Sequence, residues 1–255
     1  MAGLNFPQYA SYKSFDPAKD NIAPFEFIPW ILGQCSTVKE AQDLLQKTNL
    51  IHEPFSADLP VSPLHFMISD RKESIVVEPL KDGLKIHGNP IGVLTNNPTF
   101  DVQLFQLNHY RKLSSRMPDN TFSPKLDLQT YSNGMGAIGM PGDWSSPSRF
   151  VRAAFIKWNS VCEPSECSSV NQFFHILNSV EHPRGSVEVK DGLYEITVYS
   201  CCCNMDKGIY YYRTYENSQI IGIDLFLENL EQNQLISYPL IKSHDFFIQN
   251  KVSNI

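Results

Sequence analysis

Four short strand-like segments in one stretch of the sequence most constrain how this chain can fold. They are His65–Asp70, Ser74–Leu80, Gly83–Gly88 and Ile91–Asn97. The residues between them, rich in Asp, Lys, Gly, Asn and Pro, are those that form tight turns. Strands joined by tight turns pair with their neighbours in sequence, so this stretch predicts an antiparallel meander.

Two helices are predicted ahead of the meander, between Pro24 and Lys47, with a break at residues 33–36. Thr37 and Glu40 have the spacing of a capping box at the start of the second helix. Four apolar residues are expected on the buried face of that helix: Val38, Ala41, Leu44 and Leu45.

Three more helices are predicted after the meander. One runs from Asp101 to about Lys112, one begins with Ser146 as cap and Pro147 as first residue, and one spans Ser169–Val180. Their expected buried faces consist of Phe100, Leu104 and Leu107; Val151, Ala154, Phe155 and Trp158; and Val170, Phe173, Phe174 and Leu177. Between the first two helices, Arg111–Ser145 lacks any clean period and is expected to be a long excursion that contacts another subunit.

The C-terminal part returns to strands, predicted over Tyr194–Asn204, Lys207–Tyr215 and Gln219–Phe226. Strands grouped in meanders with helices between the groups favour an α+β fold, in which helices cover antiparallel sheets, over a parallel βαβ arrangement. No linker interrupts the pattern, so one domain is expected over residues 1–255.

Charge and composition exclude several classes of function. The net charge is −6 and no stretch concentrates Lys and Arg, so nucleic-acid binding lacks electrostatic support. No apolar run approaches the roughly twenty residues of a membrane-spanning helix, and no signal peptide is recognised. The seven histidines lack the spacing of metal ligands, and the sequence has no GxGxxG motif or phosphate loop; no metal or organic cofactor is expected.

The six cysteines suit neither a disulfide framework nor a zinc site, because three of them are adjacent at Cys201–Cys203. We expect buried or half-buried thiols in a reducing cytoplasm. Catalysis by an internal cysteine and a histidine stays open as an alternative.

Three residues are candidates for a reactive site. Asn5 and Asn96 are amides at strand ends, where an N–H donor can face a cleft and stabilise an oxyanion, although either asparagine could simply form a turn. Arg149 falls in the first turn of a predicted helix, where the helix dipole disfavours a cation. An anion should compensate, either a structural carboxylate or an anion of the site such as a thiolate.

Several long motifs occur in a characteristic order: "AGLNFPQYA", "IGVLTNNPTFDVQLFQLNHYR", "GMPGDWSSPSRFVRAAF" and "KGIYYYRTYENSQI". With them the chain closely resembles the choloylglycine hydrolase family, which contains bile salt hydrolases and penicillin V acylases. The resemblance extends from Ala2 to about Pro239.

The resemblance implies an αββα sandwich of the N-terminal nucleophile hydrolases, cleavage of the amide of glycine- or taurine-conjugated bile acids, a homotetramer and a cytoplasmic location. It assigns Asn5 and Asn96 to oxyanion stabilisation and places Arg149 beside the nucleophile. Apolar residues that could cover a steroid, or equally serve in the core, are Phe55, Ala57, Leu59, Val61 and Leu64. Penicillin V or another N-acyl amide is the competing substrate.

The chain departs from the family pattern at its start. The family's nucleophile is an N-terminal cysteine, whereas Met1 and Ala2 stand here and removal of Met1 would expose Ala2. This difference leads to the expectation of a domain that is incomplete at its N-terminus and of an inactive chain that at most binds bile acids or pairs with a full-length subunit.

Overall fold

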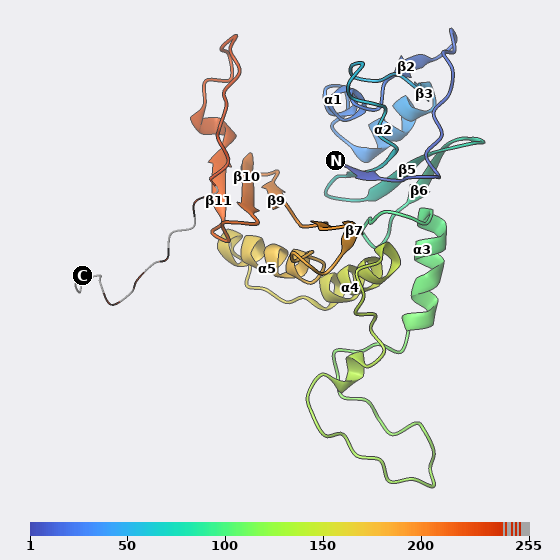
Figure 1. Ribbon diagram of the computed structural model, residues 1–255, viewed down its shortest axis with the longest axis vertical. Coiled ribbons are helices and arrows are strands. Elements are labelled where there is room, and N and C mark those ends of the chain that lie inside the picture. Colours follow the sequence, from blue (N-terminus) through green and yellow to red (C-terminus); the bar gives the residue numbers. More distant parts are fainter. Residues whose placement is uncertain (242, 244–245, 247, 249, 251–255) are drawn as a thin grey trace. The chain divides into compact units, whose positions relative to one another are not determined.

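The computed structural model describes residues 1–241, 243, 246, 248 and 250. The chain divides into two compact units, Met1–Asn159 and Ser160–Ile255 (Figure 1). The single domain expected over residues 1–255 stays a prediction.

The first unit contains a four-stranded antiparallel sheet. Its strand order is β1 (Ala2–Asn5), β4 (Leu64–Ser69), β5 (Ser74–Leu80) and β6 (Gly83–Gly88). The three consecutive strands β4 to β6 confirm the predicted meander, because their turns are too short to allow any other pairing. The opening residues of the chain add β1 beside β4.

The fourth predicted strand, Ile91–Asn97, is wrong, since the chain leaves the sheet after β6. The Asn89 side chain accepts a hydrogen bond from the Gly92 amide at 2.8 Å and donates one to the Val93 carbonyl at 3.1 Å. Gly92 has a φ of +62°, a conformation that glycine adopts readily. This turn directs Leu94 into the core instead of extending the sheet.

Helices cover one face of this sheet through α1 (Phe27–Leu32) and α2 (Val38–Leu45). The predicted capping box is confirmed, because the Thr37 side chain accepts a hydrogen bond from the Glu40 amide at 3.2 Å. A short parallel pair, β2 (Asp20–Ile22) with β3 (Thr48–Leu50), lies before α1 and after α2 in the chain. The core on this face consists of Phe27, Ile31, Val38, Ala41, Leu45, Leu50, Phe66, Ile68, Ile75 and Val77.

The other face carries α3 (Phe100–Gln106), which continues into the 3₁₀ turn η1 (Leu107–Tyr110), and α4 (Ser146–Asn159). Successive side chains of a strand point to opposite faces, so Val76 of β5 joins this second core while its two neighbours join the first. Its buried members are Val76, Leu94, Phe100 and Phe150.

The helix α4 begins one residue earlier than predicted, so Ser145 instead of Ser146 precedes it. Trp158 was expected on its buried face but is 64% exposed. The Trp158 indole N–H donates to the Ile91 carbonyl at 3.1 Å, which fixes one edge of the ring and leaves the rest in solvent.

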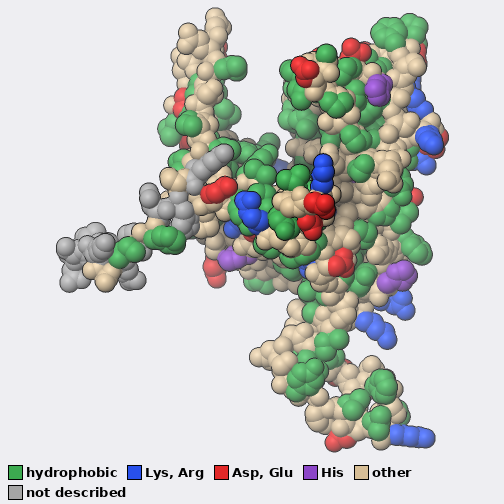
Figure 2. Space-filling model, viewed as in Figure 1, with side chains coloured by type: hydrophobic (Ala, Val, Ile, Leu, Met, Phe, Trp, Pro, Cys, Tyr) green, Lys and Arg blue, Asp and Glu red, His purple; other side chains and the backbone are tan. Residues whose placement is uncertain are grey.

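Residues 111–145 form the predicted excursion, hereafter the 111–145 loop, which extends away from α3 and α4 (Figure 1). Apart from the short 3₁₀ turn η2 (Met135–Ala137), it has no regular structure. The Ser114 amide donates to the Gly136 carbonyl at 2.8 Å and closes the base of the loop. Hydrophobic side chains lie exposed along it (Figure 2), with Phe122 80% and Tyr131 83% exposed.

The second unit combines α5 (Glu166–Asn178) with a three-stranded antiparallel sheet in the order β11 (Ile221–Asp224), β10 (Ile209–Thr214) and β9 (Tyr199–Asn204). The 3₁₀ turn η3 (Leu225–Leu227) follows β11. The strand predicted over Tyr194–Asn204 is interrupted.

The first residue of that predicted strand, Tyr194, belongs to β8 (Leu193–Tyr194), which pairs with β7 (Glu188–Lys190). Regular pairing resumes only at β9. In α5, Phe174 is buried as predicted, whereas Phe173, the adjacent residue and so about 100° away around the helix, is 42% exposed.

The α+β class is confirmed, since helices cover antiparallel sheets. All six cysteines are free thiols, but Cys162, Cys167 and Cys203 are exposed, contrary to the expected burial. In the part of the chain that the structure describes, no helix is both long and apolar enough to cross a membrane.

Candidate active site

The structure brings the two candidate asparagines together from distant parts of the first unit. Asn5 ends β1, and Asn96 lies in the irregular segment that precedes α3. The Asn96 Nδ2 atom donates to the Asn5 backbone carbonyl at 2.8 Å, across 91 residues of sequence. Next to it, Asn97 Nδ2 donates to the Pro7 carbonyl at 2.6 Å, so both amides hold the chain that follows β1.

Arg149, in the first turn of α4, joins this pair. Its Nη2 atom donates to Asn96 Oδ1 at 2.7 Å, and its Nε donates to the Trp144 carbonyl at 3.1 Å. A guanidinium can only donate, so the Asn96 atom that it contacts must be the oxygen. The arginine therefore fixes which end of the Asn96 amide faces Asn5.

Two side-chain amides remain able to donate at this place. An NH₂ group has two N–H bonds, and Asn96 uses one of them for the Asn5 carbonyl. The Asn5 side chain is exposed and makes no hydrogen bond to the described residues. The Asn96 N–H donor, fixed by a guanidinium, is suited to binding a carbonyl oxygen as it becomes an oxyanion, and the Asn5 amide can donate as well.

Buried polar groups hold the backbone around Asn96. Gln103 on α3 is fully buried, and its Nε2 donates to the carbonyls of Asn96 at 2.6 Å and Pro98 at 2.9 Å. Its Oε1 accepts from the Thr95 hydroxyl at 2.8 Å. The Ser146 hydroxyl, at the start of α4, donates to the same Thr95 oxygen at 2.9 Å.

A second buried group lies beneath Thr95. The His65 ring on β4 is fully buried, with Nε2 2.7 Å from the Thr95 carbonyl and Nδ1 3.2 Å from Glu78 Oε1. Glu78 on β5 is also fully buried, and its Oε1 accepts from the Phe100 amide at 2.9 Å. His87 Nε2 lies 3.4 Å from the other Glu78 oxygen, close enough for an ion pair but poorly aligned for a hydrogen bond.

These contacts change the acidity of the carboxyl group. Burial alone raises the pKa of Glu78, but the interactions with His65 and His87 and the hydrogen bond from the Phe100 amide together lower it below its usual value. The pKa of His87 is raised, chiefly by its interaction with Glu78.

Three buried residues beside the candidate site were not predicted from the sequence: His65, Glu78 and Gln103. Each of them lies on a face of its strand or helix that otherwise carries apolar residues. Gln103, for example, follows the buried Phe100 by three residues on α3. A polar residue at a core-facing position is the one signal that could have found them, since burying such a group requires a hydrogen-bond partner.

The apolar residues expected to cover a substrate lie in and beside residues 52–63. Phe55 is 67% exposed, Leu59 is 55% exposed and Ala57 is exposed. This segment ends beside the candidate site, because the Phe6 amide donates to the Pro63 carbonyl at 2.7 Å. Leu64, which pairs with Asn5 in the sheet register, packs against the core and so fits the core role left open for it.

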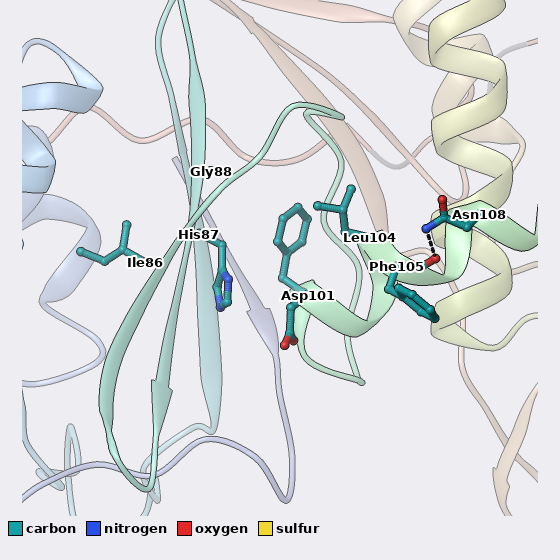
Figure 3. Close-up of a pocket in the computed structure, with 8 residues that line it drawn as sticks. Ile86, His87, Gly88, Asp101, Leu104, Phe105 and Asn108 are labelled. Carbon is teal, nitrogen blue, oxygen red and sulfur yellow. Dashed lines mark hydrogen bonds between the residues drawn. The ribbon is translucent and has the colours of Figure 1, made fainter. Parts of the chain in front are cut away.

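A separate hollow of about 490 Å³ lies between β6 and α3 (Figure 3). His87, Asp101 and Leu104 line it, and the Asn108 side chain at its rim donates to the Phe105 carbonyl at 2.7 Å. None of the three candidate residues lines this hollow. Among the described residues, no cluster of His, Cys, Asp or Glu could hold a metal ion.

The fold and the donor set are those expected of an enzyme that hydrolyses amides. The chain belongs to the choloylglycine hydrolase family of linear amide C–N hydrolases, whose family model matches residues 1–238. The predicted family and enzyme class are thereby confirmed.

Characterised relatives agree with this assignment. A bile salt hydrolase/transferase of Lactiplantibacillus plantarum is 58% identical over 250 residues, which cover 98% of this chain and 77% of the relative. A bile salt hydrolase/transferase of Clostridium perfringens is 40% identical and covers 95% of this chain and 74% of the relative.

Solved structures share the fold. A variant of the conjugated bile acid hydrolase of Clostridium perfringens matches with a TM-score of 0.90 at 40% identity, over 98% of this chain and 76% of that one. The penicillin V acylase of Agrobacterium tumefaciens matches with a TM-score of 0.65 at 20% identity, over 85% of this chain and 60% of that one. The second likeness concerns the fold alone.

Proposed function

We propose that this chain belongs to a hydrolase of conjugated bile acids and contributes the groups that stabilise the oxyanion. When a nucleophile attacks an amide carbonyl, the oxygen gains negative charge, and donors already in place lower the barrier. Asn5 and Asn96 donate to that oxygen, and Arg149 holds the Asn96 amide in the donating orientation. The observation that carries this proposal is the contact series from Arg149 through Asn96 to Asn5.

The attacking group lies outside this trio, because neither an amide nor a guanidinium is a nucleophile at neutral pH. The three residues therefore supply the electrostatic part of the reaction. The chemistry needs only hydrogen bonds and charge from them.

Conjugated bile acids are preferred as substrates over penicillin V. Relatives at 58% and 40% identity carry names that refer to bile salts, whereas the penicillin V acylase is only 20% identical. The exposed Phe55 and Leu59 also offer an apolar surface for a steroid, and Phe25 meets Phe55 edge to face with ring centroids 5.2 Å apart.

The test is release of free glycine and taurine from glycocholate and taurocholate by the purified chain, with penicillin V as the comparison substrate. Where the chain releases an amine, Asn96→Ala should lower the rate by about 100-fold or more, because one oxyanion donor is typically worth 10²–10³ in rate. Asn108→Ala removes an exposed asparagine of η1 and serves as the control, with an unchanged rate.

An Asn96→Ala variant that keeps the full rate would contradict the assigned role. Faster cleavage of penicillin V than of either bile acid would overturn the substrate class. Absence of amine release by the chain itself would count against the proposed function.

We further propose that the 111–145 loop contacts a second copy of this chain. Its exposed aromatic side chains, Phe122 and Tyr131, are the kind that become buried between subunits.

A cytoplasmic location is also proposed, and the six free cysteines support it because thiols persist in a reducing compartment.

A further inference from the structure

One buried imidazole touches both segments that carry the candidate asparagines. The Phe6 ring, immediately after Asn5, stacks on the His65 ring with centroids 4.2 Å apart and an interplanar angle of 7°. On its other side, His65 Nε2 lies 2.7 Å from the carbonyl of Thr95, immediately before Asn96. Both rings are fully buried.

The contacts of His65 fix where its protons lie. A carbonyl oxygen only accepts, so Nε2 must carry the proton that bonds to Thr95. Nδ1 and Glu78 Oε1, 3.2 Å apart, would repel as two bare acceptors, so one further proton lies between them. Glu78 thus holds the ring in the state and orientation in which Nε2 donates to Thr95.

Two residues of α3 also hold this cluster in place. Glu78 is itself held by the Phe100 amide at 2.9 Å, at the start of α3. Gln103, on the same helix, bonds to the Asn96 carbonyl. The peptide groups on both sides of the Asn96 Cα are therefore held, the Thr95 carbonyl by His65 and the Asn96 carbonyl by Gln103, which leaves the Asn96 side chain little freedom to shift.

We propose that His65, oriented by Glu78, is a positioning residue that sets the distance between the Asn5 and Asn96 donors. The proposal rests on the oxyanion function proposed above for these asparagines. His65 touches neither candidate donor group directly, and it acts through the Phe6 ring and the Thr95 carbonyl.

The first measurement is the ¹⁵N NMR spectrum of the histidine side chains in the purified chain. His65 Nε2 should carry a slowly exchanging proton, because it is buried and hydrogen-bonded. An unprotonated Nε2 on His65 would overturn the proposal, and this result needs neither a variant nor turnover.

The second measurement compares the side-chain amide signals of Asn5 and Asn96 in two variants. His65→Leu should shift both signals, and His65→Gln, whose amide can still donate to Thr95, should restore at least the Asn96 signal. His109→Gln, at an exposed histidine, is the control and should shift neither. Asn5 and Asn96 signals that stay unchanged in folded His65→Leu, or a His65→Gln spectrum equal to that of His65→Leu, would overturn the proposal.

Turnover separates this proposal from the one it rests on. Where the chain releases glycine or taurine, His65→Leu should lower kcat by about 100-fold with KM unchanged, since a misplacement of about 1 Å costs that much. An equal kcat in His65→Leu and the parent chain would overturn the positioning role. Absence of release by the parent chain counts against the proposed function alone, and the NMR result then decides the role of His65.

Discussion

At the scale of single residues, the buried carboxylate Glu78 makes the stability of the fold around the site depend on pH. It faces His65 and His87, and His87 faces Asp101 and Lys85 as well. The Glu78 pKa lies below its ordinary value, whereas the His87 pKa lies above its own. These shifts set the pH range in which the cluster stabilises the fold.

The sign of each contribution follows from its shift. Because its pKa is lowered, ionised Glu78 contributes its full stabilisation above pH 4.5, its ordinary pKa. This contribution is lost as pH falls through the pKa of the folded state. Because its pKa is raised, protonated His87 contributes its full stabilisation below pH 6.5, its ordinary pKa. This contribution is lost as pH rises through the pKa of the folded state. The pair should therefore stabilise the chain most between pH 4.5 and 6.5.

We expect the melting temperature of the chain to fall above pH 6.5, and His87→Gln to remove most of that fall. The reason is that His87 gives up its proton and its attraction to Glu78 in this range. The measurement is thermal unfolding from pH 4.5 to 8. His109→Gln, at an exposed position, should keep the parent profile; parallel curves for His87→Gln and the parent would contradict the prediction.

The candidate residues themselves were predictable only in part. Asn5, Asn96 and Arg149 stand out in the sequence as amides at strand ends and a cation at a helix start. Sequence cannot show that Asn96 is held by Gln103 and Thr95 by His65, because such bonds depend on which distant residues meet in the core.

At the scale of elements, the start of α4 is held by a carboxylate. Asp143 Oδ2 accepts from the Ser148 hydroxyl at 2.6 Å, and Oδ1 accepts from the Ser145 amide at 2.9 Å. Hydrogen bonds from Ser145 and then Ser148 lower the pKa of Asp143 to about 2. A negative charge here also suits the positive end of the helix dipole.

We predict that Asp143→Ala lowers the free energy of unfolding by about 0.3–1 kcal/mol, the usual value of a charge at an exposed helix start. The difference should be present above pH 3.8 and disappear as pH falls toward about 2, where the carboxyl becomes protonated. Urea unfolding at several pH values measures it. Asp119→Ala, in the 111–145 loop, should leave stability unchanged; an Asp143→Ala loss that does not depend on pH would argue against the charge.

Local signals predicted the elements that local contacts determine. The Thr37 and Glu40 cap needs only neighbours in sequence, so its spacing was sufficient. The segment Ile91–Asn97 has the composition of a strand, yet the Asn89 side chain turns it into the core, and strand composition does not reveal such a bond. The parallel pair β2 and β3 was missed because strands this short show no period.

At the scale of the whole molecule, self-association should depend on the 111–145 loop. The double variant Phe122→Ser and Tyr131→Ser removes its most exposed aromatic groups, and the core does not contain either one. We expect the parent chain to sediment as an oligomer and the variant to sediment as a smaller species with the same circular dichroism. Sedimentation velocity checks this, with Phe226→Ser as a matched exposed change in the second unit that should not alter the oligomer; identical profiles for parent and double variant would rule out the loop.

The bracing of Asn96 from several elements limits how this donor pair could be transplanted. A designer who grafts only the two asparagines onto another scaffold would copy the donors without the residues that orient them. The smallest portable unit comprises the end of β1 with Phe6, the paired strands β4 and β5 with His65 and Glu78, and the starts of α3 and α4 with Gln103 and Arg149. Recipient scaffolds must therefore already place two helix starts on one face of a sheet.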